Sequence, residues 1–194
     1  MLDVAFKTFI ELGYEGASVA EIARRAGSSK QTIYTRFPTK ADLFKAVISR
    51  GTDAFLEIFR GLLVSDKPIK AVLQRYGEHL VIGMLQPESQ QFVRTIIAAS
   101  VDFPEIAQFF WEHGRQQAQA ELSKYLEEQA HKHLLRMSDP AVAADVFESL
   151  CLGVTPMMSP MGIALHRDAA EIRKHVREAI RVFFAAYGPN RKSC

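Results

Sequence analysis

The stretch SVAEIARRAGSSKQTIYTRFPTKADLFK, residues 18–45, predicts two short helices joined by a tight turn and followed by the start of a third. Ser18 and Glu21 have the spacing of a capping box, which marks the beginning of a helix. Gly27 can adopt the left-handed conformation that ends one. Two short helices around a glycine-containing turn form a helix-turn-helix, whose second helix can enter the major groove of DNA.

The second helix is expected over residues 30–37. Ser28 and Ser29 provide its N-terminal cap, and Pro38 ends it because proline disfavours helix at the preceding residue. Thr39 and Asp42 have the spacing of a second capping box, so a third helix is expected to open at Lys40. The positive end of its dipole and its free N–H groups suit a phosphate.

Polar side chains on the second helix have the chemistry of DNA recognition. Gln31 can form two hydrogen bonds to adenine, and threonine can donate to a base or contact a thymine methyl group. Lys30, Lys40 and the hydroxyl of Tyr34 suit phosphate oxygens, which fix register without reading sequence. The second helix is therefore predicted to be the reading helix.

Residues 1–50 resemble the N-terminal domain of the TetR family of bacterial transcriptional regulators. The matching residues are Ala5, Phe6, Phe9, Gly13, Tyr14, Ser18, Val19, Ile22, Ala23, Ala26, Gly27, Ser29, Lys30, Thr32, Tyr34, Phe37, Lys40, Leu43 and Phe44. The resemblance implies an all-helical homodimer that represses transcription and leaves its double-stranded operator when a small molecule binds the C-terminal domain.

The resemblance also assigns roles to residues of the motif. The DNA contacts that we predict come from Ser18, Ser28, Ser29, Lys30, Gln31, Thr32, Tyr34, Thr35 and Lys40. Ser28, Gln31 and Thr35 would lie nearest the bases, and the others would contact phosphates or position the reading helix.

Two features depart from the family pattern. Gln31 stands where many members have a small residue such as glycine, so an unusual base preference is expected. The chain also begins almost at the first core positions of the first helix, without the basic arm that many members carry. Minor-groove contacts are therefore not expected, and a start codon further upstream stays open.

Composition and charge agree with a folded DNA-binding protein. The chain has 194 residues, of which 48% are hydrophobic and 24% charged. Residues 1–50 hold eight Lys/Arg and five Asp/Glu, a net +3, whereas the remaining residues have a net −1. The positive excess lies where the motif lies, as DNA binding requires. No signal peptide and no apolar run of ~18 residues is visible, so a cytoplasmic protein without a membrane partner is expected.

The expected fold class is all-α, with about nine helices. A three-helix helix-turn-helix domain, 1–46, precedes a larger helical domain for effector binding and dimerisation, 47–194. The helix that opens at Lys40 is expected to continue for about 23 residues, or about 34 Å, and to join the two. Further helices are expected over 2–12, which Gly13 would end, and over 69–84, 88–99, 105–134, 141–155 and 168–187. Pro156, Pro160 and Gly162 are expected to break the chain after the helix over 141–155.

Apolar residues recur at helical spacing along the last two long helices. They are either the core of the chain itself or a dimer interface made of two helices from each copy. The resemblance to TetR regulators favours the interface. Its predicted residues are Val146, Leu150, Ile172, Val176, Ile180, Phe183 and Tyr187.

The middle of the chain is rich in aromatic residues and methionine, which suit an adaptable ligand cavity between helices. The predicted effector-binding residues are Phe55, Phe59, Met84, Phe92, Arg94, Ile96, Phe110, Trp111 and Met157. Ordinary core is the alternative for each of them. The runs 92–94 and 102–105 look similar to the C-terminal domain of AefR-like regulators. We expect a hydrophobic or amphipathic organic effector.

Other functions find little support in the sequence. It shows no glycine-rich phosphate loop, nucleophile elbow or paired-cysteine motif, so an enzyme is not expected and no cofactor is implied. Glu127 and His131 share a helix face, but His133 points elsewhere, so no metal site is expected. Two alternatives stay open, namely a DNA-binding protein without a sensor and a redox-responsive regulator acting through Cys194.

Overall fold

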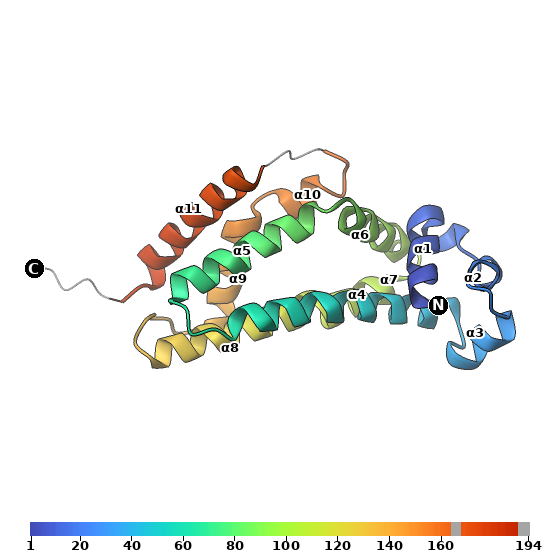
Figure 1. The fold of residues 1–194 in the computed structure, drawn as a ribbon, viewed down its shortest axis with the longest axis horizontal. Helices are drawn as coiled ribbons and strands as arrows, with labels where there is room; N and C mark the ends of the chain where they lie inside the picture. The colour runs from blue at the N-terminus through green and yellow to red at the C-terminus, as the bar shows by residue number, and fades with distance from the viewer. Residues whose placement is uncertain (164–167, 190–194) are drawn as a thin grey trace, which may run out of the picture. The chain divides into compact units, whose positions relative to one another are not determined.

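The computed structural model describes residues 1–163 and 168–189, and every element in these ranges is helical, which confirms the predicted fold class (Figure 1). The elements are α1 (Leu2–Gly16), α2 (Val19–Arg25), α3 (Lys30–Arg36), α4 (Lys40–Leu63), α5 (Ile69–Leu85), α6 (Pro87–Ser100), α7 (Pro104–Phe110), the π-helix η1 (Trp111–Arg115), α8 (Gln116–His131), α9 (Pro140–Leu152), α10 (Thr155–Met158) and α11 (Ala169–Tyr187). None of these helices is both long enough and apolar enough to cross a lipid bilayer. Cys194 lies outside the described residues.

The chain packs as two compact units. The first unit contains residues 1–56 and 87–116, and the second unit contains residues 57–86 and 117–194. The helix α4 runs through position 46 without interruption. The expected assignment of DNA binding to 1–46 and of effector binding with dimerisation to 47–194 stays a prediction.

The core of the first unit joins the helix-turn-helix to helices far away in sequence. Phe9 of α1, Ile33 of α3 and Phe44 of α4 are fully buried in one cluster. The cluster also contains Ile96 of α6 and Ile106 of α7. The position of the reading helix therefore depends on residues of α6 and α7 as well as on its own three-helix neighbourhood.

The turn between α2 and α3 forms as the sequence predicts. Gly27 has a φ of 60°, in the left-handed region. The N–H of Ser28 donates to the carbonyl of Ala23 at 3.0 Å and the N–H of Gly27 donates to that of Arg24, which together make a Schellman ending of α2. Because an L-residue with a Cβ is strained at this φ, glycine fits position 27.

The two capping boxes of the motif differ in outcome. The Ser18 hydroxyl accepts from the N–H of Glu21 at 3.1 Å, but the Glu21 carboxylate bonds arginines, so that box is half formed. Thr39 and Asp42 form a complete box at the start of α4, each side chain accepting from the other's N–H at 3.0 Å.

The first helix is longer than predicted. Gly13, expected to end it, has a φ of 71° and kinks the helix, which continues for three more residues to Gly16. The kink places Tyr14 in the core of the first unit, where only 4% of its surface is exposed.

The single helix expected over 105–134 is interrupted by η1 and ends at His131. Gly114 in η1 approaches α4 so closely that a Cβ there would lie 2.9 Å from Cγ2 of Thr52. The extra residue of a π-turn locally rotates a helix relative to its α-helical course. Beyond α8 the chain turns at His133, whose φ is 59°.

The second unit has its own core, in which α5 packs against α9 and α11. At this crossing a Cβ on Gly77 would lie 2.7 Å from Cγ1 of Val176 and 2.9 Å from Sγ of Cys151. Burial raises the pKa of the Cys151 thiol to about 12, so this thiol is protonated at neutral pH. The hydroxyl of Tyr76 donates to Glu148 at 2.6 Å inside the same core.

Two boundaries near the end of α9 differ from the prediction. The helix was expected to run to Thr155, but it ends at Leu152 because Gly153 adopts a φ of 54°. The one-turn helix α10 then forms where the sequence indicated only a break, with Pro156 inside its first turn.

Candidate nucleic-acid interface

The reading helix α3 has one buried side and one polar side. Ile33 is fully buried and anchors the helix in the first unit. The exposed side chains of the helix are those of Lys30, Gln31, Thr32, Tyr34, Thr35 and Arg36. All five residues of α3 that were predicted to contact DNA are thus placed together and accessible.

Three hydroxyls around the start of α3 are already hydrogen-bonded. Ser29 Oγ accepts from the N–H of Thr32 at 3.0 Å and lies 2.8 Å from Thr32 Oγ1. Thr35 Oγ1 donates to the carbonyl of Gln31 at 2.8 Å. Thr35 therefore offers a base its lone pairs and its methyl group, whereas the exposed Gln31 amide can both donate and accept.

The hydroxyl of Ser18 serves two purposes at the start of α2. Its oxygen accepts from the N–H of Glu21, and its own hydrogen is left to donate to a phosphate. Ser18 is exposed, as that second role requires.

The start of α4 offers less to a phosphate than the sequence indicated. The capping box uses the backbone N–H groups of Thr39 and Asp42, and it places a carboxylate at the positive end of the helix dipole. The expectation of free N–H groups at this terminus therefore needs correction for those two positions. The cation nearby is Lys40, whose Nζ donates to the carbonyl of Glu15 at 3.3 Å.

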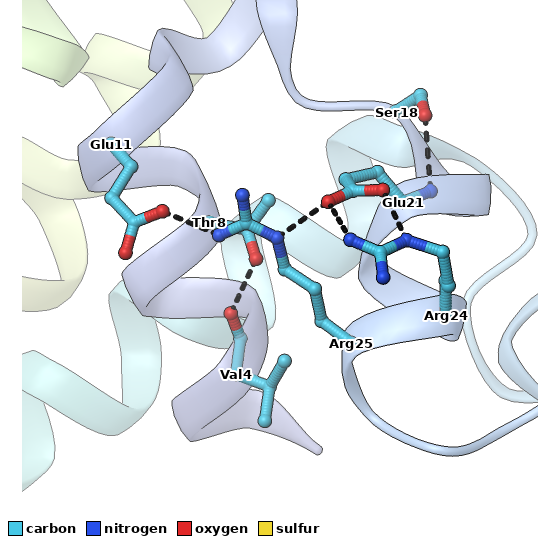
Figure 2. A network of polar contacts seen from close by, with 7 residues as sticks. All are labelled: Val4, Thr8, Glu11, Ser18, Glu21, Arg24 and Arg25. Carbon is cyan, nitrogen blue, oxygen red and sulfur yellow. Dashed lines mark hydrogen bonds and ion pairs between the residues drawn. The ribbon is translucent and has the colours of Figure 1, made fainter.

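An ion-pair network ties α2 to α1 (Figure 2). Both carboxylate oxygens of Glu21 accept from the guanidinium of Arg24, at 2.7 and 2.8 Å, and one also accepts from Arg25 at 2.6 Å. Arg25 in turn donates to Glu11 of α1 at 2.5 Å. Hydrogen bonds from Arg24 and then Arg25 lower the pKa of Glu21 to about 2, so the network stays ionised at neutral pH.

This network was not predicted, because Glu21 was interpreted only as part of the capping box. The consecutive arginines three and four residues after Glu21 were the available signal, since side chains at these spacings meet on a helix. The pairs are exposed, so each one adds little stability, but a forked guanidinium restricts the orientation of α2 on α1.

The predicted effector-binding residues are distributed over both units. Phe55, Phe92, Arg94, Ile96, Phe110 and Trp111 belong to the first unit, and Phe59, Met84 and Met157 belong to the second. Ile96 and Phe59 are buried in the two cores, which fits the alternative of ordinary core for them, whereas Trp111 and Met157 are more than half exposed.

The second unit has an open pocket of about 250 Å³. It is lined by Arg60, Leu63, Val64, Glu121, Lys124, Tyr125 and Glu128, none of which was predicted. Arg60 and Glu121 form an ion pair at 2.7 Å within it. The lining combines the charged side chains of Arg60, Glu121, Lys124 and Glu128 with Leu63, Val64 and Tyr125.

The predicted dimer residues divide into two groups. Ile172, Val176, Ile180 and Phe183 are buried within the chain, so most of the apolar stripe of α11 packs in the core of the second unit. Val146, Leu150 and Tyr187 are half-buried. The same two helices carry exposed apolar side chains, namely Val142 on α9, with 53% of its surface exposed, and Val182 on α11, with 39%.

Hydrogen bonds at both ends show that α9 and α11 run antiparallel. The N–H of Arg136, just before α9, donates to the carbonyl of Tyr187 at the end of α11, at 2.7 Å. His175, near the start of α11, lies 2.9 Å from the carbonyl of Cys151 through Nε2. Val142 and Val182 therefore lie toward the same end of this helix pair.

Within 1–163 and 168–189, no three His, Cys, Asp or Glu side chains are arranged to hold a metal ion. Glu127, His131 and His133 are each exposed.

Two family models together match most of the chain. Residues 1–47 match the family model described as bacterial regulatory proteins, tetR family. Residues 71–189 match that of the C-terminal domain of AefR-like transcriptional repressors.

Curated relatives are also regulators. YvkB of Bacillus subtilis (strain 168), an uncharacterized HTH-type transcriptional regulator, is 28% identical over 159 residues, which are 79% of this chain and 78% of that protein. The HTH-type transcriptional repressor ComR of Escherichia coli (strain K12) is 34% identical over 76 residues, which are 39% of this chain and 36% of ComR. The second match thus spans only about a third of that repressor.

Solved structures share the fold along nearly the whole chain. A structure described as that of a TetR-family transcriptional regulator from Mesorhizobium loti MAFF303099 has a TM-score of 0.89 at 26% identity, covering 96% of this chain and 94% of that one. The Flavonoid-responsive Regulator FrrA has a TM-score of 0.81 at 28% identity, covering 97% and 95%.

Proposed function

The chain belongs to the TetR family of bacterial regulatory proteins and is a DNA-binding transcriptional regulator, and we propose that it is a repressor that a small hydrophobic effector releases from a palindromic operator. Two copies would form a homodimer, and each copy would place its α3 in one of two successive major grooves, about 34–36 Å apart. The observation that carries this proposal is the exposed polar face of α3, held on the buried Ile33 of the first unit.

Within this proposal the polar residues have separate tasks. Lys30, Lys40 and the hydroxyls of Ser18, Thr32 and Tyr34 would bind phosphates or position α3, with Ser29 as its cap. Gln31, Thr35 and Ser28 would contact base edges. Phosphate contacts give affinity that depends on salt but not on sequence, whereas base contacts give specificity.

This separation of tasks gives a test with two substitutions. On a duplex selected by the full-length protein from a random pool, Lys40→Ala is expected to weaken selected and random DNA about equally and to lower the salt slope by about one. Gln31→Ala is expected to relax preference at one base position, by about 1–3 kcal/mol. Both are measured by fluorescence anisotropy at several salt concentrations.

The matched control is Lys67→Ala, which removes an exposed lysine from the loop before α5 in the second unit. It should leave both affinity and salt slope unchanged. If Lys40→Ala altered specificity alone, or if the wild-type chain bound selected and random DNA equally, the assigned roles would be wrong.

The effector that we propose is a small hydrophobic or amphipathic organic molecule. FrrA, similar over nearly the whole chain, is a flavonoid-responsive regulator, so flavonoids are the first compounds to test. An effector can shift the equilibrium only by its difference in affinity for the DNA-binding and released states. A hundredfold loss of operator affinity requires a difference in effector-binding free energy of roughly 2.7 kcal/mol between the two states.

A panel of flavonoids and medium-chain fatty acids tests this proposal. We expect at least one compound to release the labelled duplex and, over the same concentrations, to change the fluorescence of Trp111, the single tryptophan of the chain. Trp111→Phe removes the optical signal and serves as its control. If no compound released DNA, the alternative of a DNA-binding protein without a sensor would be favoured.

A further inference from the structure

The ammonium group of Lys40 lies against an aromatic ring in the first unit. Its Nζ is 4.5 Å from the centroid of the Tyr14 ring, while one of its N–H groups donates to the carbonyl of Glu15. A cation over an aromatic face is attracted by the ring quadrupole, more strongly where water is excluded. Tyr14 is buried, so its ring offers such a surface.

The ring itself is fixed by three further aromatic residues. It stacks nearly parallel to Phe9, at 6.0 Å between centroids, and tilts against Phe44 at 5.1 Å. Phe103 packs edge-on at 5.1 Å. Because Phe103 is the N-cap residue of α7, the place of the Tyr14 ring depends on where α7 begins.

Lysine normally loses considerable rotamer freedom when it binds a phosphate. The contacts with the Tyr14 ring and the Glu15 carbonyl restrict Lys40 before any DNA is bound. An ammonium has three donors, so one bond to Glu15 leaves others for a phosphate oxygen.

We propose that Tyr14 is a positioning residue for Lys40, and that Phe103 makes the position of the ammonium depend on the start of α7. This inference rests on the proposed phosphate contact of Lys40. It gives α7 a route to the DNA contact through two side-chain contacts, Phe103 to Tyr14 and Tyr14 to Lys40.

A double-mutant cycle tests the inference on the full-length protein and a selected, labelled duplex. Tyr14→Leu is expected to weaken binding by about three- to tenfold, because the ring that holds the ammonium is lost. Tyr14→Phe keeps the ring and should stay within about twofold of wild type. In a Lys40→Ala background, Tyr14→Leu should weaken DNA binding by a further factor of less than about two, because the group that Tyr14 positions is absent.

The possible results separate this inference from the proposed function. If Lys40→Ala left DNA binding unchanged, the phosphate contact would fail and this inference with it. If Lys40→Ala weakened DNA binding but Tyr14→Leu weakened it by the same factor with or without Lys40, the ring would have only a structural role. The proposed function would then stand, and the inference about Tyr14 would be wrong. Tighter binding by Tyr14→Leu would also overturn it, since the ring would then compete with the phosphate.

A measurement without any change at Tyr14 guards against misfolding of the leucine variant. In the wild-type protein, the Hε resonances of Lys40, identified by their loss in Lys40→Ala, are expected to be shifted upfield by the ring current of Tyr14. Phe103→Leu should reduce that shift and weaken DNA binding by about two- to threefold. Unshifted Hε resonances, or a shift that Phe103→Leu leaves intact, would contradict the corresponding step.

Discussion

A chain that carries both Val142→Asp and Val182→Asp is expected to be monomeric and to bind a selected operator duplex at least about 100-fold more weakly than wild type. Two helix-turn-helix domains joined in one dimer bind DNA about 10²–10⁴ times more tightly than a single domain, because the second contact becomes intramolecular. Dissociation of the dimer removes this gain without changing any residue that is predicted to contact DNA. Sedimentation velocity measures the assembly, and anisotropy measures the affinity.

The two valines were chosen because both are exposed and lie toward the same end of α9 and α11. Surface substitutions of this kind usually change stability by less than about 0.5 kcal/mol, so the fold should persist. Burying a carboxylate in an apolar interface, in contrast, is costly. The buried stripe of α11 would not give a clean test, because substitutions there would disturb the core of the second unit.

Val64→Asp is the matched control. Val64 is exposed in the loop after α4, and the change adds the same charge. It should leave assembly and affinity as in wild type. A double variant that stayed dimeric would show that α9 and α11 do not form the interface, and a wild-type chain that was monomeric at micromolar concentration would contradict the proposed dimer itself.

Replacing Gly77 by alanine is expected to lower the free energy of unfolding by about 1–2 kcal/mol. The new Cβ would meet Val176 at 2.7 Å and the Cys151 sulfur at 2.9 Å, so α5 and its neighbours must move apart. Overpacking of this kind costs roughly 1–3 kcal/mol, against which alanine gains at most about 1 kcal/mol in helix propensity. Thermal and urea unfolding measure the change.

Gly61→Ala in α4 is the control for helix propensity alone. A Cβ at Gly61 has no atom within 4 Å, so this substitution should stabilise the chain by up to about 1 kcal/mol. The two variants therefore change stability in opposite directions. If both were stabilising, the crossing of α5 with α9 and α11 would have room for a methyl group, and the close packing would be refuted.

Local signals predicted the helix-turn-helix well. The caps at Ser18 and Ser29, the left-handed Gly27 and the box at Thr39 depend on residues at most five positions apart. The physical causes of these features are local, so they can be recognised in the sequence.

Features that depend on tertiary packing could not be predicted in this way. The stripe of α11 has the same spacing whether it faces its own core or a second copy, and only the fold shows that Val176 packs beside Gly77. The close approach of Gly114 in η1 to Thr52 of α4 likewise joins residues far apart in the sequence. The bond from Arg25 to Glu11 joins residues fourteen apart, so no helical spacing predicts it.

The shared core of the first unit has a consequence for protein engineering. Because Ile96, Ala99 and Ile106 pack in one cluster with Phe9 and Ile33, a reading head excised at the end of its three-helix motif would expose the apolar surface that α6 and α7 cover. A chimeric regulator with altered promoter choice would then fold well only if the transplanted segment brought residues 87–116 with it, or if the recipient supplied side chains of matching shape.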